Sequence, residues 1–440
     1  MTAPVSTAYL IETMQDARSR TLELVHDLDD EPLMGPRLPP VNPLRWEIGH
    51  VAHFYEYFIL RQLYKYKSAL GERADQLYDS IKINHDLRWD LPLPTRAETL
   101  AYMQTVLDRL AERLDGGMAT EQDSFIYQFG IFHEDMHTEA FLWARQTLAY
   151  ATPTLTVAAD VSEERSAGAY PGWVEVPGGE FQLGASRNAP FLFDNEKWAH
   201  RLVIEPFEIA KAPVTNREFQ AFTDDDGYGQ EAFWSTEGWK WVQEARAKHP
   251  VYWQPDTPGK WLLKRFDQTL PLPPDEPVMH VNWYEADAYC RWSGLRLPME
   301  AEWEAAALGE PAADGALAAS KRRYPWGEAP PDPSLANLDG RALAPVDVAA
   351  MVAGDSAFGC RQMLGNVWEW TADTFSAFPG FSADAYTEYS TMLFGNTKVL
   401  RGGAWTTRSR MIHGTYRNYF PADRQDVFAG FRTCRANAGK

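Results

Sequence analysis

The sequence predicts an α+β protein of two domains, a helical bundle over residues 1–165 and an irregular α+β domain over residues 166–440. At 440 residues the chain is too long for one ordinary core. Apolar residues recur at helical spacing in the first part, and short β-like runs punctuated by Pro and Gly follow. Hydrophobic residues make up 45% of the chain and aromatic residues 13%, which is enough for two dense cores.

Four segments of the first domain have the pattern of amphipathic helices: residues 8–28, 45–67, 96–114 and 124–150. The two prolines of Leu91–Thr95 break the chain, and Thr95 can then cap the third helix. Asp123 and Ser124 are the candidate N-caps of the fourth helix. A four-helix bundle follows, and the core of such a bundle commonly holds metals through side chains of facing helices.

The stretch Ala151–Ala169 is small and polar, which is typical of a linker, and we place the domain boundary near residue 165. The second domain begins with β-like runs at Trp173–Val176 and Arg201–Ile204. Three helices are expected within it, near residues 215–224, 283–292 and 299–307.

The charge of the chain limits its partners, and other features of its composition indicate its compartment. The formal net charge of −19 disfavours nucleic acid and anionic membranes, because both require clustered Lys and Arg. The N-terminal residues do not have the basic start and apolar core of a signal peptide. No apolar run approaches the length of about 20 residues that a helix needs to cross a bilayer. The three cysteines, Cys290, Cys360 and Cys434, are expected to be buried free thiols. We therefore expect a cytoplasmic enzyme of small-molecule substrates.

Histidines form the chemical centre of the sequence. His133 and His137 lie four residues apart in the fourth predicted helix, which places both imidazoles on one helical face. His50 in the second predicted helix can complete a three-histidine site, and His53 is the alternative third ligand. Three neutral imidazoles suit iron(II) but also accept zinc, copper or nickel, and they leave open coordination positions.

Two other interpretations of the histidine pair stay open. His133-Glu134-x-x-His137 is also the signature of zinc proteases, with Glu134 as general base. The extended protease pattern is absent, since Ala140 and Trp143 occupy its glycine and third histidine positions. Outside a protease, Glu134 is expected on the rim of the bundle or beside a ligand. The two histidines can also be satisfied core residues.

Six ordered motifs of the second domain resemble the formylglycine-generating-enzyme-like, C-type-lectin-type fold. They are Gly178–Phe181, Pro213–Phe219, Pro277–Trp283, Arg296–Glu304, Gly365–Trp370 and Arg401–Trp405. Their tryptophans are expected to pack the fold, and Gly402 and Gly403 to serve backbone geometry. Residues 404–416 contain no cysteine, which excludes a copper-dependent formylglycine-generating oxidase and leaves a substrate-binding role.

The bundle resembles the DinB-like domain that precedes this module in the sulfoxide synthases of ergothioneine biosynthesis. The resemblance implies iron(II) bound by His50, His133 and His137, and the use of O2 to join a sulfur donor to the imidazole C2 of hercynine. It also implies that the segment 415–420 lines the hercynine pocket. Among Arg417, Asn418, Tyr419 and Phe420, Asn418 would bind the betaine carboxylate and Tyr419 the trimethylammonium group.

The chain departs from this family pattern at several positions. Phe375 and Phe378 occupy the positions where relatives place a tyrosine that donates a proton or hydrogen atom, so no catalytic residue is assigned. Phe420 replaces an acidic residue that grips the amino group of γ-glutamylcysteine, although Arg88 remains a possible carboxylate clamp. Phe54 and Met136 replace glutamines that contact the hercynine imidazole.

These departures favour the selenoneine synthase branch, in which a selenosugar is the donor, because apolar and aromatic walls suit a sugar. An ergothioneine sulfoxide synthase that uses cysteine or another thiol is the alternative within the class. A zinc-dependent hydrolase on a DinB-like bundle and a binding protein without catalysis are the alternatives outside it.

Overall fold

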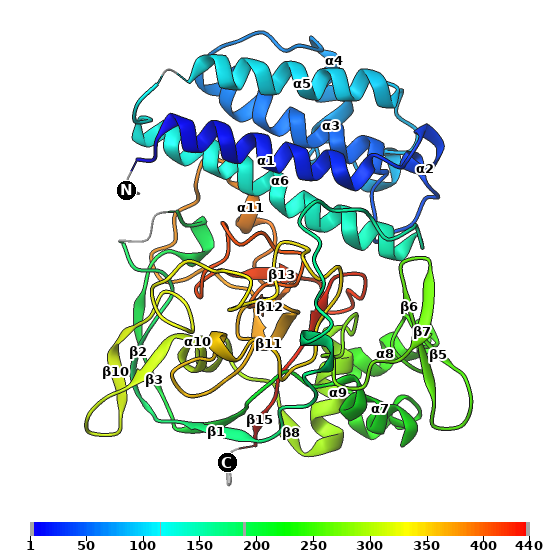
Figure 1. The fold of residues 1–440 in the computed structure, drawn as a ribbon, viewed down its shortest axis with the longest axis vertical. Coiled ribbons are helices and arrows are strands. Elements are labelled where there is room, and N and C mark those ends of the chain that lie inside the picture. The colour runs from blue at the N-terminus through cyan, green and yellow to red at the C-terminus, as the bar shows by residue number, and fades with distance from the viewer. Residues whose placement is uncertain (1–3, 115, 188–190, 437–440) are drawn as a thin grey trace. The chain divides into compact units, whose positions relative to one another are not determined.

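The computed structural model describes residues 4–114, 116–187 and 191–436. The chain divides into two compact units, Met1–Thr156 and Val157–Lys440. Figure 1 shows helices in the first unit and a mixture of short strands and helices in the second. The α+β fold class predicted from the sequence is confirmed. None of the described helices is both long enough and apolar enough to cross a membrane.

The division between the units lies before residue 165, because the expected linker packs on the second unit. The backbone N–H of Ala159 donates to the carbonyl of Arg341. Val161 lies in a buried cluster with Ala342 and Val346. Composition marked this segment as a connection but could not show which core it joins.

In the described residues of the first unit there are four long α-helices, as predicted, and two short ones. They are α1 (Thr7–Val25), α2 (Asp30–Met34), α3 (Leu44–Tyr55), α4 (Arg73–Tyr78), α5 (Arg96–Arg113) and α6 (Glu121–Thr147). The predicted helix 45–67 is α3 followed by a π-helical segment, Glu56–Leu63.

Helix caps explain where two of these helices begin. Thr95 caps α5 through a capping box with Glu98, as expected. The predicted caps of α6 are wrong: the helix begins one turn earlier, where Thr120 accepts a hydrogen bond from the Asp123 N–H at 3.0 Å. Asp123 returns the bond by accepting from the Thr120 hydroxyl, so it completes the cap from inside the helix.

Two glycines allow close packing around α3 and α6. A Cβ at Gly49 would lie 2.3 Å from the ring of Tyr78, and a Cβ at Gly130 would lie 2.6 Å from the ring of Tyr55. Any larger residue would push these rings away from the helices. Gly49 precedes His50 directly, so this packing also decides where that imidazole lies.

The second unit is built from small sheets. One has the order β1 (Trp173–Val176), β4 (Phe207–Ala210), β15 (Cys434–Arg435), β8 (Leu295–Arg296), and another β13 (Asn418–Phe420), β12 (Lys398–Arg401), β11 (Trp368–Thr374), β14 (Ala429–Gly430). The remaining strands are β2 (Gly179–Leu183) with β3 (His200–Ile204), β5 (Trp253–Pro255) with β6 (Trp261–Arg265) and β7 (Gln268–Pro271), and β9 (Gly309–Pro311) with β10 (Leu317–Lys321).

The helices of this unit are α7 (Asn216–Asp224), α8 (Thr236–Ala245), α9 (Trp283–Ser293), α10 (Glu300–Leu308) and α11 (Glu388–Thr391). Three of them confirm the predicted helices, whereas α8 and α11 were not predicted. Trp368 and Trp370 of β11 are buried, which confirms their packing role. Gly402 and Gly403 have φ values of +95° and +80°, which confirms their backbone role. All three cysteines are free and buried, as expected.

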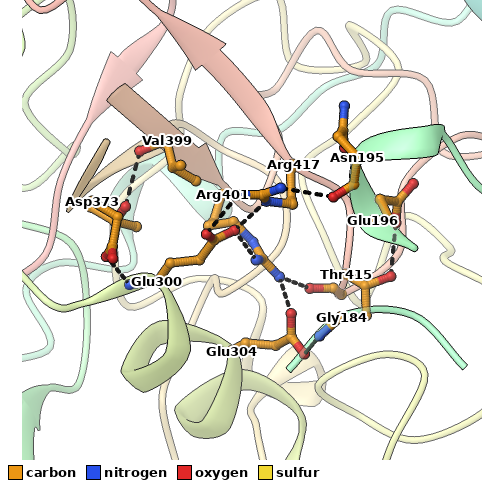
Figure 2. A network of polar contacts seen from close by, with 12 residues as sticks. Gly184, Asn195, Glu196, Glu300, Glu304, Asp373, Val399, Arg401, Thr415 and Arg417 are labelled. Atoms are coloured by element: carbon orange, nitrogen blue, oxygen red, sulfur yellow. Dashed lines mark hydrogen bonds and ion pairs between the residues drawn. The ribbon is translucent and has the colours of Figure 1, made fainter. Parts of the chain in front are cut away.

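Buried ion pairs connect β12, β13 and α10 (Figure 2). Arg401 donates to Glu300 at 2.8 Å and to Glu304 at 2.7 Å, and its side chain has no exposed surface. Arg417, next to β13, donates to both carboxylate oxygens of Glu300 at 2.7 and 3.0 Å. One α10 carboxylate therefore holds two arginines from neighbouring segments of the sheet.

We expect Gly49→Ala to lower the free energy of unfolding by about 1–3 kcal/mol, because the added methyl group overlaps the Tyr78 ring. Chemical denaturation measures this. Gly116→Ala is the matched control, since nothing lies within 4 Å of its Cβ, and it should change stability by less than about 0.5 kcal/mol. Equal effects of the two substitutions would contradict this packing.

We expect Arg401→Leu to cost about 3–5 kcal/mol of stability, because two buried carboxylates each lose one of their cationic partners. Arg217 makes the control. It pairs with Asp275 at 3.1 Å on the surface, where its side chain is 64% exposed. Arg217→Leu should cost less than about 1 kcal/mol in the same denaturation experiment. A loss of that size for Arg401→Leu would refute the role of the network.

Candidate metal centre

The three histidines that the sequence predicts as metal ligands lie close together in the structure. His50 lies on α3, and His133 and His137 lie one turn apart on α6. One ring nitrogen from each histidine lies within 4.8 Å of the others. Among the residues that the structure describes, no other group of three or more His, Cys, Asp or Glu side chains has this arrangement.

His50 is held by a backbone carbonyl and by an aromatic ring. Its Nδ1 lies 2.9 Å from the carbonyl oxygen of Tyr78, and its ring stacks on Trp46 at 4.8 Å with an interplanar angle of 8°. A carbonyl oxygen only accepts, so Nδ1 carries the proton and Nε2 keeps its lone pair. Nε2 is therefore the atom available to a metal.

His137 is held by a carboxylate. Its Nδ1 lies 2.7 Å from Oε1 of Glu47, which occupies the first turn of α3. The carboxylate accepts a hydrogen bond from Nδ1–H, so Nε2 is the nitrogen of His137 that can face a metal. The only sign of the Glu47–His137 bond in the sequence is that Glu47 lies three positions before His50. At that spacing the side chains of Glu47 and His50 share one face of α3.

His133 is held by packing alone. Its ring stacks on Phe54 with centroids 3.6 Å apart and an interplanar angle of 10°. Its buried Nδ1 has no hydrogen-bond partner among the described residues. A buried ring nitrogen without a partner costs free energy, and a metal bound at that nitrogen would offset the cost.

The electrostatics favour the neutral form of two of these ligands, His50 and His133. Burial lowers the pKa of His50 and His133 well below the ordinary value of histidine, and repulsion from the neighbouring imidazoles lowers both pKa values further. Neutral imidazole is the form that binds metals. The residues present therefore fit a divalent metal with nitrogen ligands.

His53 does not join the cluster. Its Nε2 lies 2.8 Å from Oδ1 of Asp75, and Arg61 donates to the same carboxylate at 2.6 and 2.8 Å. The structure thus separates the two candidate third ligands: His50 faces α6, and His53 belongs to an ion-pair group with Asp75 and Arg61.

Glu134 is not on the rim of the bundle, so that expectation is wrong. Its side chain is fully buried, and Oε1 accepts hydrogen bonds from Arg18 at 2.9 Å and Thr21 at 2.8 Å, both on α1. One helical step separates it from His133 and turns it toward α1. The general base that a zinc protease requires is therefore engaged elsewhere.

Arg88 also packs on Trp46, with its guanidinium carbon 3.9 Å from the ring centroid. It also donates to Oδ1 of Asn42 at 2.5 Å. Trp46 thus contacts both Arg88 and His50, and its stacking on His50 helps to orient the imidazole. This role of Trp46 was not predicted, because a tryptophan before a histidine carries no specific spacing signal.

In the second unit, the segment expected to contact substrate follows a buried arginine. The Arg417 guanidinium binds Glu300 and the carbonyls of Asn195 and Ser376, so its donors serve the protein itself (Figure 2). Asn418 is half-buried, and its Oδ1 accepts from the Tyr419 N–H at 2.9 Å. Arg417 therefore positions β13 and does not offer its charge to a ligand.

Aromatic residues surround Tyr419. Its ring stacks on Phe375 with centroids 4.0 Å apart, and its hydroxyl donates to the carbonyl of Tyr389. Phe375 is fully buried, and Phe378 lies under the Arg417 guanidinium at 4.0 Å. The guanidinium carbon of Arg424 lies 5.5 Å from the centroid of the Phe420 ring. The two phenylalanines at the expected tyrosine positions thus belong to the packing that supports β13.

Known proteins resemble the chain over both units. Residues 13–141 match the DinB superfamily, and residues 158–437 match the Sulfatase-modifying factor enzyme 1-like domain. A hercynine oxygenase from Mycolicibacterium smegmatis is 38% identical over 432 residues, covering 96% of this chain and 98% of the relative. A hercynine oxygenase from Mycobacterium tuberculosis is 39% identical over 419 residues, covering 94% of this chain and 96% of the relative.

The chain belongs to the hercynine oxygenase family. Membership makes it an enzyme of the oxidoreductase class. A formylglycine-generating enzyme from Thermomonospora curvata is 33% identical, but the match covers only 47% of this chain and 72% of that enzyme. The match to both units together, and not to the second unit alone, therefore decides the family.

The lowered pKa values predict that the metal-free protein loses stability in acid. Unfolded histidines titrate near pH 6.5, whereas folded His50 and His133 stay neutral to much lower pH. Below pH 6.5 the unfolded state binds more protons, so this stability is complete above pH 6.5 and falls as the pH approaches the lowered folded pKa values. The loss should be about 1 kcal/mol per pH unit for each histidine.

Denaturation of the metal-free protein at pH 7.5 and pH 5.5 measures this loss. His133→Phe should reduce the difference between the two pH values, because the ring then carries no proton in either state. His26→Asn is the control, since the side chain of His26 is 57% exposed, and it should leave the difference unchanged. The same pH dependence in all three proteins would show that the buried imidazoles do not cause it.

Proposed function

We propose that this chain is a nonheme iron(II), O2-dependent enzyme that forms a carbon–selenium or carbon–sulfur bond at imidazole C2 of hercynine. The observation that carries the proposal is a cluster of three imidazoles, two of them buried, in a member of the hercynine oxygenase family. Three nitrogen ligands leave open positions, which oxidative coupling needs and a closed structural site lacks.

His50, His133 and His137 would hold the iron, which supplies open coordination positions for O2 and for the chalcogen of the donor. The protein's contribution is to orient two of the imidazoles, His50 through the Tyr78 carbonyl and His137 through Glu47. The buried free thiols of the chain support a reducing compartment, and we propose the cytoplasm.

For hercynine we propose Asn418 and Tyr419 as contacts, with Phe420 on the donor side and Arg417 holding their strand. Because Asn418 accepts the Tyr419 N–H through Oδ1, its Nδ2 is the atom that can donate to the betaine carboxylate. Phe375 stacks on Tyr419, which orients its ring for a cation–π contact with trimethylammonium.

The selenium donor is the finer part of the proposal. Phe375 and Phe378 carry no hydroxyl and lie inside the packing below β13, so neither can donate a proton. A selenol is more acidic and more nucleophilic than a thiol, and would depend less on such a donor. An apolar side chain at Phe420 likewise suits an uncharged selenosugar better than the ammonium group of γ-glutamylcysteine.

An ergothioneine sulfoxide synthase that uses cysteine is the second candidate. The identity of 38–39% to hercynine oxygenases over nearly the whole chain favours it. The zinc hydrolase is not favoured, because Glu134 pairs with Arg18 in the bundle core.

The test is anaerobic reconstitution with iron(II), followed by O2, hercynine and one donor at a time: 1-selenoglucose, cysteine or γ-glutamylcysteine. We expect an O2-dependent product with the selenium isotope pattern on hercynine, detected by mass spectrometry. His133→Ala, which removes one ligand, is the control and should give none.

A sulfoxide adduct formed only with cysteine would assign the chain to the ergothioneine branch. The absence of any O2-dependent product with all three donors would refute oxidative coupling.

A further inference from the structure

We propose that Glu47 is a positioning residue of the metal centre, which holds His137 through its Nδ1 proton and supplies the negative charge that balances the bound cation. This inference rests on the proposed metal site but not on hercynine or on the donor. It concerns a residue that contacts a ligand and not the metal itself.

The geometry of the pair is that of an oriented metal ligand. Oε1 of Glu47 lies 2.7 Å from Nδ1 of His137, and the Glu47 side chain is only 2% exposed. In the part of the chain that the structure describes, His137 is the hydrogen-bond partner of this carboxylate. A carboxylate on the remote nitrogen fixes the tautomer and increases the basicity of the nitrogen that binds metal.

Burying a carboxylate is costly, and two features offset the cost at Glu47. The residue lies in the first turn of α3, where the helix dipole favours a negative charge. The second feature is the hydrogen bond to His137. This bond becomes stronger when a cation polarises the imidazole. The carboxylate is thus stabilised most when the site holds a metal.

The three ligands differ in what supports them, so they should differ in donor strength. A neutral carbonyl holds His50, an aromatic face holds His133, and a carboxylate holds His137. Three neutral imidazoles bring no negative charge to a divalent cation. Of these supports, only Glu47 supplies one, and we infer that His137 is the strongest donor of the three.

The chain offers a matched control for this role. His53, which like Glu47 lies on α3, makes a comparable histidine–carboxylate bond. Its Nε2 lies 2.8 Å from Oδ1 of Asp75 on α4. His53 lies outside the cluster of ligand nitrogens. A substitution at Asp75 therefore removes a histidine–carboxylate bond from the bundle without touching a proposed ligand.

The experiment compares Co(II) binding by the metal-free full-length protein and its variants Glu47→Gln, Glu47→Ala and Asp75→Asn. Glu47→Gln keeps an acceptor but removes the charge, and Glu47→Ala removes both. Anaerobic competition with a chelator gives dissociation constants, visible absorption reports the Co(II) ligand field, and circular dichroism confirms folding.

We expect Glu47→Ala to weaken Co(II) binding by about 10–100-fold and Glu47→Gln by about tenfold, each with a shifted absorption spectrum. Asp75→Asn should retain the dissociation constant and the spectrum of the wild type. Unchanged binding in both Glu47 variants would overturn the inference, and so would an equal loss in Asp75→Asn.

The outcome separates this inference from the proposed function. A wild-type protein that binds Co(II) but gives no product from hercynine would refute the function, while the Glu47 comparison still decides the role of that residue. A wild-type protein that binds no divalent metal would refute the metal centre and this inference together.

Discussion

The packing of α3 against α6 is the constraint on which the candidate site depends. Three imidazoles meet there, and burial disfavours a charge on His50 and on His133. Gly49 admits the Tyr78 ring beside α3, and the carbonyl of the same tyrosine accepts the His50 proton. Packing and tautomer at His50 therefore follow from one arrangement of α3, α4 and α6, and that arrangement produces the form of histidine that metals require.

The second unit shows how buried charge can serve positioning instead of chemistry. Glu300 holds Arg401 and Arg417, and Arg417 directly precedes β13 (Figure 2). Because all of these groups are paired, they contribute a rigid support and no free charge. Phe375 and Phe378 extend this support with aromatic packing below the strand. The segment proposed to contact substrate thus rests on paired buried charges and aromatic packing.

The sequence errors share one physical cause, which is that a pattern gives positions along the chain but not the partner of each side chain. Asp123 has the chemistry of an N-cap, yet Thr120 one turn earlier forms the cap and uses Asp123 within it. Glu134 follows a ligand directly, but one helical step turns it toward Arg18 on α1. The segment after Thr156 has the composition of a linker, but its Val161 packs in a buried cluster of the second unit.

The sequence alone determined the two-domain α+β class, the main helices and the three histidines, because periodicity of 3.6 residues and four-residue spacing are local properties. It also carried the family motifs. Only the tertiary structure decided that His50 and not His53 faces α6, that Glu134 is engaged elsewhere and that Glu47 holds His137. Each of these depends on which side chains meet across helices far apart in the chain, and that is set by packing, which no local pattern encodes.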